Sequence, residues 1–126
     1  MTLKGHATTA FAIIIEPWTL SSLVTNLGLA ACRGGASSFR TNVAYALKTL
    51  NLPNVIMYID AGHGGTVGWD ANLKPAAAEL SAVYKEAESP SQVRGIAVNT
   101  AGWNSWYVFF NISSFVILHQ YSSCKF

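Results

Sequence analysis

Three short apolar runs, separated by longer segments of mixed polarity, set the pattern of this chain. The runs FAIII (residues 11–15) and VIMYI (residues 55–59) are apolar at every position, and RGIAVN (residues 94–99) is a weaker third example. A strand that is apolar on both faces is typical of a parallel sheet covered by helices. The pattern therefore predicts three adjacent parallel strands.

The two segments between these runs have helical periodicity. SSFRTNVAYALKTL (residues 37–50) begins at a serine that can cap a helix, and Pro53 follows its end. PAAAELSAVYKEAES (residues 75–89) has Pro75 in its first turn, and Pro90 follows it. The residues expected to face inward are Phe39, Val43, Ala46, Leu47 and Leu50 in the first helix, and Leu80, Val83, Tyr84 and Ala87 in the second. The order strand, helix, strand, helix, strand predicts an α/β fold with right-handed crossovers.

The composition fits one folded domain. The chain has 126 residues, of which 51% are hydrophobic and 11% charged, and this supplies enough apolar material for a sizeable core. Its net charge is +2, and its eight Lys and Arg residues are scattered along the chain. Because nucleic-acid binding needs clustered positive charge, we expect no nucleic-acid partner.

The cysteines and the apolar segments near the two ends add further expectations. Cys32 and Cys124 fit no zinc-binding spacing, so we expect no metal or other cofactor, and they are either two thiols or one disulfide. The apolar run at residues 10–15 is shorter than the core of a signal peptide. The run at residues 106–121 is shorter than the about 20 residues that a membrane helix needs. We therefore expect no export signal and no membrane span.

Chemically versatile side chains follow each predicted strand. Trp18 comes shortly after the first strand, Asp60, His63 and Trp69 come after the second, and Asn99 closes the third. In parallel α/β folds, the loops at the carboxyl ends of the strands meet at one rim and carry the chemistry. Asp offers hydrogen-bond acceptance or acid–base capacity, His a donor near neutral pH, and Trp a flat apolar surface. This combination suits a sugar ring.

Each of these residues also has a structural interpretation. Asp60 can cap the end of its strand, His63 can make ordinary loop hydrogen bonds, and Asn99 can serve as a turn residue. Trp69 can pack in the core or within its loop, and Glu16 fits a buried carboxylate that is paired at the end of its strand.

Three blocks of this sequence resemble one enzyme family. IEPxxLxxLVTNL (residues 15–27), LNLPNVIMYIDAGHGGTVGWDAN (residues 50–72) and VYKEAESPSQVRGIAVNTAGWNSW (residues 83–106) are similar to consecutive blocks of the family 6 glycoside hydrolases, the cellulases and cellobiohydrolases that act with inversion. The resemblance implies an α/β fold that is part of a distorted TIM-like (β/α) barrel. It also implies a β-1,4-glucan or cello-oligosaccharide partner and, since the family is usually secreted, an extracellular location.

The resemblance assigns roles to individual residues. Asp60 matches a sugar-binding aspartate, His63 an active-site histidine, Trp69 a sugar-stacking tryptophan and Asn99 a substrate-site asparagine. These four are the expected substrate-binding residues. Trp18 stands where the family has the aspartate that protonates the leaving oxygen, and an indole has no titratable proton to supply. We therefore expect Trp18 to fill the place of the general acid, and no residue is assigned a catalytic role.

Two further positions bear on the family pattern. Thr66 stands where the cellobiohydrolases tend to have another tryptophan, which implies a weaker subsite. Cys32 matches a family cysteine whose disulfide partner lies upstream of the matching region, and this speaks against a Cys32–Cys124 disulfide.

The extent of the resemblance divides the chain and leaves three functions open. Residues 1–106 are interpreted as part of the family's catalytic domain, and residues 107–126 as a divergent apolar tail. The expected function is that of a truncated and impaired inverting β-1,4-glucanase. The alternatives are a β-glucan-binding remnant without enzymatic activity and a truncated product without function. An incomplete barrel would also leave open sheet edges through which copies of the chain could associate.

Overall fold

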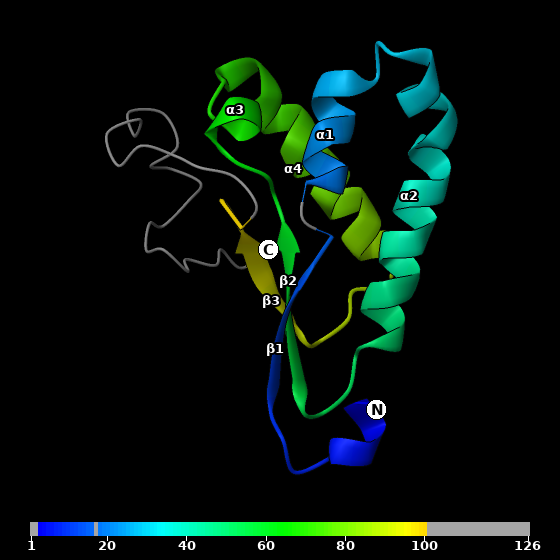
Figure 1. The fold of residues 1–126 in the computed structure, drawn as a ribbon, viewed down its shortest axis with the longest axis vertical. Coiled ribbons are helices and arrows are strands. Elements are labelled where there is room, and N and C mark those ends of the chain that lie inside the picture. Colours follow the sequence, from blue (N-terminus) through cyan, green and yellow to red (C-terminus); the bar gives the residue numbers. More distant parts are fainter. Residues whose placement is uncertain (1–2, 17, 101–126) are drawn as a thin grey trace.

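The computed structural model describes residues 3–16 and 18–100, which form a parallel sheet with helices beside it (Figure 1). The sheet has three strands in the order β1-β2-β3: β1 is Phe11–Ile15, β2 is Val55–Asp60 and β3 is Val93–Ala97. Both pairings are parallel, with Phe11 beside Val55 in one and Asp60 beside Ala97 in the other. The predicted strands, their direction and their adjacency are confirmed.

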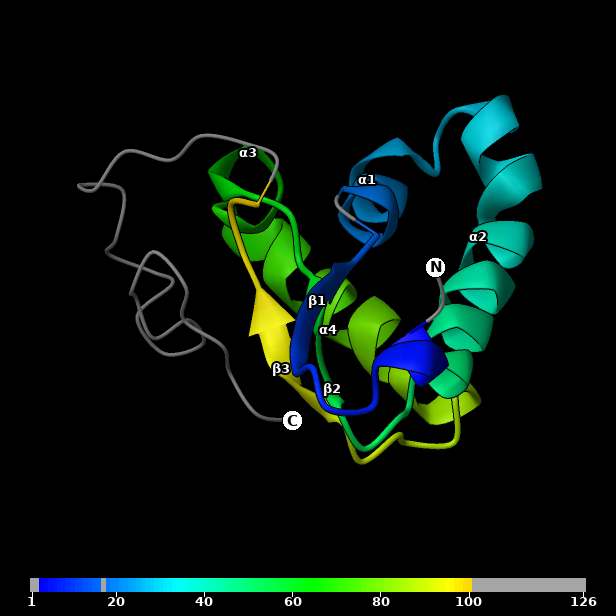
Figure 2. The same cartoon turned by 60° about the horizontal axis from the view of Figure 1, so that its bottom comes forward.

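The helices form one layer. The structure places α1 at Thr19–Asn26, α2 at Ala30–Thr49 and α4 at Asp70–Glu86, with the short helices η1 at Leu3–His6 and α3 at Gly64–Val67. Helices α1, α2 and α4 contact one another and lie beside the sheet (Figures 1 and 2). None of the helices in residues 3–16 and 18–100 is long and apolar enough to cross a bilayer.

Helix α2 begins well before the predicted serine cap. It starts at Ala30, so Ser37 lies on an exposed face inside the helix. The predicted inward position of Phe39 is also wrong, because Phe39 lies at the margin of the buried stripe and is exposed. Arg40 is closer to the middle of that stripe and is kept there by a two-pronged ion pair with Glu79 of α4. An arginine can occupy such a position because its aliphatic stem packs while its charged end is paired.

Helix α4 also begins earlier than predicted. It starts at Asp70, which puts an acidic side chain in the first turn, where the helix dipole favours negative charge. Pro75 consequently lies inside the helix rather than in its first turn, and it deprives the carbonyl of Ala71 of the usual N–H donor. Both residues are exposed, so water can serve that carbonyl and the helix continues.

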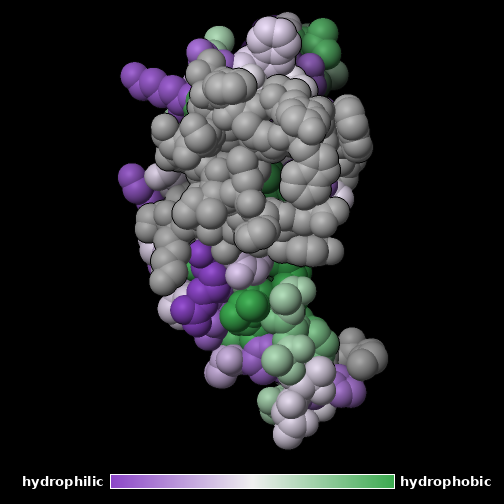
Figure 3. Space-filling model, turned by 90° about the vertical axis from the view of Figure 1, so that its left-hand side faces the viewer, coloured by the Kyte–Doolittle hydropathy of each residue, from purple (hydrophilic) through white to green (hydrophobic). Residues whose placement is uncertain are grey.

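The core lies between the sheet and the helix layer. Alternate residues of β2 point into it, and Val55, Met57 and Ile59 are fully buried. They pack in one cluster with Leu20 and Leu23 of α1, Val43 and Leu47 of α2, and Leu80 and Val83 of α4. On the other face of the sheet, Ile56 is exposed, and Figure 3 shows apolar side chains gathered on that side of the molecule. The predicted burial of β2 on both faces is therefore confirmed for only one face within the described residues.

Two glycines inside α2 allow a test of its contribution to stability. An added Cβ at Gly34 meets no atom within 4 Å, whereas at Gly35 it meets the ring of Phe39 at 3.3 Å. We expect Gly34→Ala to raise the free energy of unfolding by about 0.8–1 kcal/mol, because alanine loses less backbone entropy in a helix. Urea denaturation measures this change. Gly35→Ala is the matched control and should gain less, and an unchanged or lower midpoint for Gly34→Ala would contradict the assignment of residue 34 to a helix interior.

Candidate functional site

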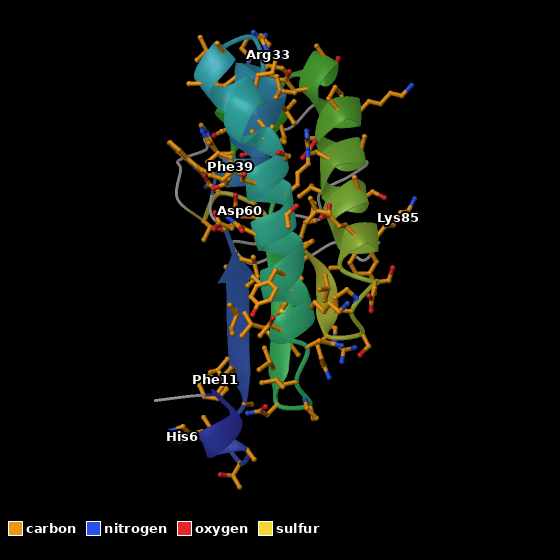
Figure 4. All side chains as sticks on the ribbon, turned by 90° about the vertical axis from the view of Figure 1, so that its right-hand side faces the viewer. His6, Phe11, Arg33, Phe39, Asp60 and Lys85 are labelled. Atoms are coloured by element: carbon orange, nitrogen blue, oxygen red, sulfur yellow. The ribbon has the colours of Figure 1, made fainter. Side chains whose placement is uncertain are left out.

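The loops that follow the three strands meet at the carboxyl end of the sheet. In Figure 4, Asp60 lies at the opposite end of the sheet from Phe11, which begins β1. The backbone N–H of Trp18 donates to Asp60 Oδ1 at 3.0 Å, and this bond joins the first loop to the second. The N–H of Asn99 donates to the carbonyl of Gly62 at 2.7 Å, and this bond joins the third loop to the second. The predicted convergence of the loops is confirmed by these two bonds.

Asp60 is the most enclosed polar residue at this rim. Its side chain is fully buried, and Oδ1 accepts a second hydrogen bond from the N–H of Gly62 at 2.8 Å. Oδ2 is also buried, but it has no hydrogen-bond partner among residues 3–16 and 18–100. Buried carboxylate oxygens are normally satisfied, so an unpartnered one indicates a place for an external donor. The hydrogen bonds that fix the loop thus use Oδ1 alone and leave Oδ2 without a donor in the described part of the chain.

Gly62 is required by the geometry of the second loop. Its φ of 85° lies in the left-handed region, and an added Cβ would meet Ser21 Oγ and Thr66 Oγ1, each at 2.5 Å. Its N–H binds Asp60 and its carbonyl binds Asn99, so one peptide unit connects two of the predicted site residues. The sequence marked this stretch as glycine-rich but did not distinguish Gly62 from its neighbours.

His63 has a structural task that the sequence did not specify. The glycine-rich segment after β2 contains the short helix α3, and His63 is its N-terminal cap. His63 Nδ1 accepts from the N–H of Gly65 at 3.1 Å, while Thr66 Oγ1 accepts from the N–H of His63 at 3.2 Å. Because Nδ1 is an acceptor, the hydrogen of the uncharged ring is on Nε2, which can donate to a ligand. Helix capping therefore uses Nδ1 and does not involve Nε2.

Trp18 does not occupy an enclosed pocket. Its side chain is 42% exposed, and its indole stacks on the imidazole of His63 with ring centroids 5.0 Å apart and an interplanar angle of 24°. Its backbone has φ 75° and ψ −22°, in the left-handed region that Asn, Asp and Gly adopt more easily than other residues. The backbone at position 18 therefore suits an aspartate, although the side chain there is an indole.

Trp69 and Asn99 are placed differently at the rim. Trp69 precedes the first residue of α4 and is 66% exposed, so the interpretation of Trp69 as a core residue is wrong. Asn99 has φ 65°, which fits the turn interpretation, but its Oδ1 is buried without a partner among the described residues. This side-chain amide oxygen is thus a second acceptor at this end of the sheet that an external donor can satisfy.

Glu16 differs from its predicted state. It is exposed rather than buried, and its Oε2 accepts from Thr19 Oγ1 at 2.6 Å in the first turn of α1. This carboxylate is in contact with water and is bonded to a neighbouring hydroxyl, so it does not need a buried base as its partner.

The described residues offer little for a metal ion. In residues 3–16 and 18–100, His, Cys, Asp and Glu form no group of three that could hold one. Cys32 is a half-buried free thiol on α2, while Cys124 and the predicted 107–126 tail lie outside the described residues.

Comparison with known proteins gives a consistent family. A model of the glycosyl hydrolases family 6 matches residues 1–123. A 1,4-β-D-glucan cellobiohydrolase CEL6C from Podospora anserina is 58% identical over 123 residues, which cover 98% of this chain and 31% of that protein. A probable 1,4-β-D-glucan cellobiohydrolase C from Aspergillus clavatus is 52% identical over 96 residues, which cover 76% of this chain and 21% of that protein.

Solved structures agree with this result. The cellobiohydrolase II (Cel6A) of Humicola insolens, in complex with glucose and cellotetraose, superimposes with a TM-score of 0.78 at 44% identity. The match covers 82% of this chain and 29% of that one, so the chain spans less than a third of the relative. The predicted resemblance and the fold class, part of a parallel α/β barrel, are confirmed.

The geometry around Gly62 predicts a strong effect of a small substitution. Gly62→Ala should lower the free energy of unfolding by about 1–3 kcal/mol, because the new methyl group would contact two hydroxyls and the backbone would be strained at positive φ. Urea denaturation measures the loss. Gly28→Ala is the control, since an added Cβ there meets nothing within 4 Å. Equal stability of the two variants would contradict the described loop.

Proposed function

The chain belongs to the glycosyl hydrolases of family 6, and on this premise we propose that it binds a β-1,4-glucan chain at the carboxyl end of its sheet. The names of the Podospora relative and of the Humicola complex support this class of ligand, since they specify 1,4-β-D-glucan and cellotetraose. The chain spans only 31% of the Podospora protein, so the activity of that whole protein has to be tested separately for this chain.

The observation that carries the proposal is the unpartnered oxygen of Asp60. Asp60 Oδ2 and Asn99 Oδ1 are both buried acceptors without donors in the described part of the chain, and they follow neighbouring strands. The hydroxyl groups along the edge of a glucose ring are donors that can satisfy both. Trp69 offers an exposed aromatic surface, and His63 Nε2 offers a donor to a sugar oxygen. The four predicted binding residues thus have complementary roles in the proposed site.

Hydrolysis by this site is proposed to be impaired. Inversion needs a carboxylic acid at the leaving oxygen and a second carboxylate about 6.5–9.5 Å away that activates water on the opposite face of the sugar. The indole of Trp18 cannot act as that acid. Asp60 cannot take both roles, and its Oδ1 is already bound by two backbone N–H groups. The chain is therefore proposed to retain binding and to lose most of its catalytic power.

A binding protein without enzymatic activity is the second candidate function. The exposed aromatic surfaces of Trp18 and Trp69 favour it, because neither indole is used in the core. A product without any function is the remaining alternative, and the absence of measurable glucan binding would indicate it.

Two further proposals follow from the family and from the sheet. We propose an extracellular location, where insoluble glucans are found. We also propose that copies of the chain associate through the edges of the sheet, since β1 and β3 are the outer strands of the described sheet.

The division into residues 1–106 and a 107–126 tail also stays a proposal, and the family match extends beyond residue 106 to residue 123.

Glucan binding can be followed by tryptophan fluorescence. We expect a change on adding cellohexaose at millimolar concentration, because a sugar ring stacked on Trp69 removes water from the indole. Trp69→Ala should abolish most of this change. Tyr45→Ala is a matched control, since Tyr45 is a 70% exposed aromatic residue on α2 away from the rim. A wild-type chain that shows no change at this ligand concentration would overturn the binding proposal.

Hydrolysis gives an independent test. We expect the wild type and Trp18→Asp to release no more sugar from cello-oligosaccharides than buffer does, since each missing proton-transfer partner typically costs about 10²–10⁴-fold. The backbone at position 18 accepts an aspartate, so the variant should fold. Asp60 is bonded to the backbone of that same residue and does not stand across a sugar ring from it. Inverted-anomer product from the purified wild type, detected by NMR during turnover, would contradict this expectation.

A further inference from the structure

We infer that Trp18 is itself a carbohydrate-binding residue, whose outer indole face stacks on a glucose ring of the bound glucan. The inference rests on the proposed function, since it adds a contact to the same rim. It differs from the expectation that the indole fills the place of a lost acid.

The first support is that only one face of the indole has a described aromatic partner. The ring stacks on His63 with centroids 5.0 Å apart, while the side chain as a whole is 42% exposed. A buried tryptophan would contribute to the core, but this one does not belong to the core cluster. An indole that stacks on another ring through one face and is partly exposed to solvent can stack on the C–H face of a sugar through its other face.

The second support is the rigid backbone at position 18. The N–H of Trp18 donates to Asp60 Oδ1, and its carbonyl accepts from Ser21 Oγ at 3.1 Å and from the N–H of Ser22 at 2.9 Å. These three bonds hold a residue with an unfavourable φ of 75° in one place. A ligand contact made by a fixed side chain loses less conformational entropy on binding than one made by a mobile side chain.

The third support is the neighbouring buried acceptor. The backbone N–H of Trp18 donates to Oδ1 of Asp60, so the carboxylate whose Oδ2 has no partner among the described residues lies beside the backbone of residue 18. A glucose ring that stacks on Trp18 would then lie next to the loop that Asp60 holds in place. This stacking selects β-linked glucose, because its ring hydroxyls are equatorial and leave both C–H faces flat. Mannose has an axial hydroxyl at C2 that makes one face uneven.

Titration of three variants tests the inference. Binding of cellohexaose and of mannohexaose to the full chain is measured by calorimetry for the wild type, Trp18→Ala, Trp18→Phe and Tyr45→Ala. The loss of one aromatic contact should weaken cellohexaose binding roughly two- to tenfold in Trp18→Ala. Trp18→Phe should retain most of the affinity, Tyr45→Ala should match the wild type, and mannohexaose should bind more weakly than cellohexaose to the wild type.

A measurement on the wild type covers the case in which Trp18→Ala does not fold. The indole N–H signals of the four tryptophans are followed by NMR during cellohexaose titration, and Trp18→Phe identifies the signal of Trp18. The inference requires that this signal shifts together with that of Trp69.

The proposed contact of Trp18 and the proposed glucan binding can fail separately. If cellohexaose binds and Trp69→Ala weakens it, but Trp18→Ala folds with unchanged affinity or the Trp18 signal stays in place, the inference is overturned and the proposed function stands. If cellohexaose does not bind to the wild type, the proposed function fails, and the inference fails with it.

Discussion

The arrangement of the rim depends on one buried carboxylate. Asp60 ends the middle strand, and its Oδ1 accepts from the backbone N–H groups of Trp18 and Gly62. A buried carboxylate without donors would be costly, and two backbone donors reduce that cost while fixing the loops that supply them. Both bonds go to Oδ1, and Oδ2 has no partner among the described residues.

The packing of the helix layer fixes the loops at this rim. The core residues of β2 pack against α1, α2 and α4, and the ion pair of Arg40 and Glu79 joins α2 to α4 where their buried stripes meet. The hydrogen bond with Glu79 is the main cause that raises the pKa of Arg40, and partial desolvation opposes it. Because helix α1 starts directly after Trp18, packing of α1 against the sheet also fixes the position of that residue.

Position 18 combines a backbone suited to one residue type with a side chain of another. Its left-handed conformation suits an aspartate, which is the residue that the family resemblance implies at this position. The indole found there is exposed and stacks on His63, and it has no titratable proton to supply.

The sequence by itself determined the strands, their parallel order, the family and the rim at which the site residues meet. Apolar runs such as residues 55–59 specify strands locally, and the blocks that resemble the family are long and ordered. The sequence did not determine where α2 and α4 begin, since packing between the helices extends them beyond the cap signals at Ser37 and Pro75. Only the tertiary structure decided which oxygen of Asp60 accepts the two backbone N–H groups and that Trp18 lies on His63, because both depend on hydrogen bonds and contacts between loops far apart in the chain.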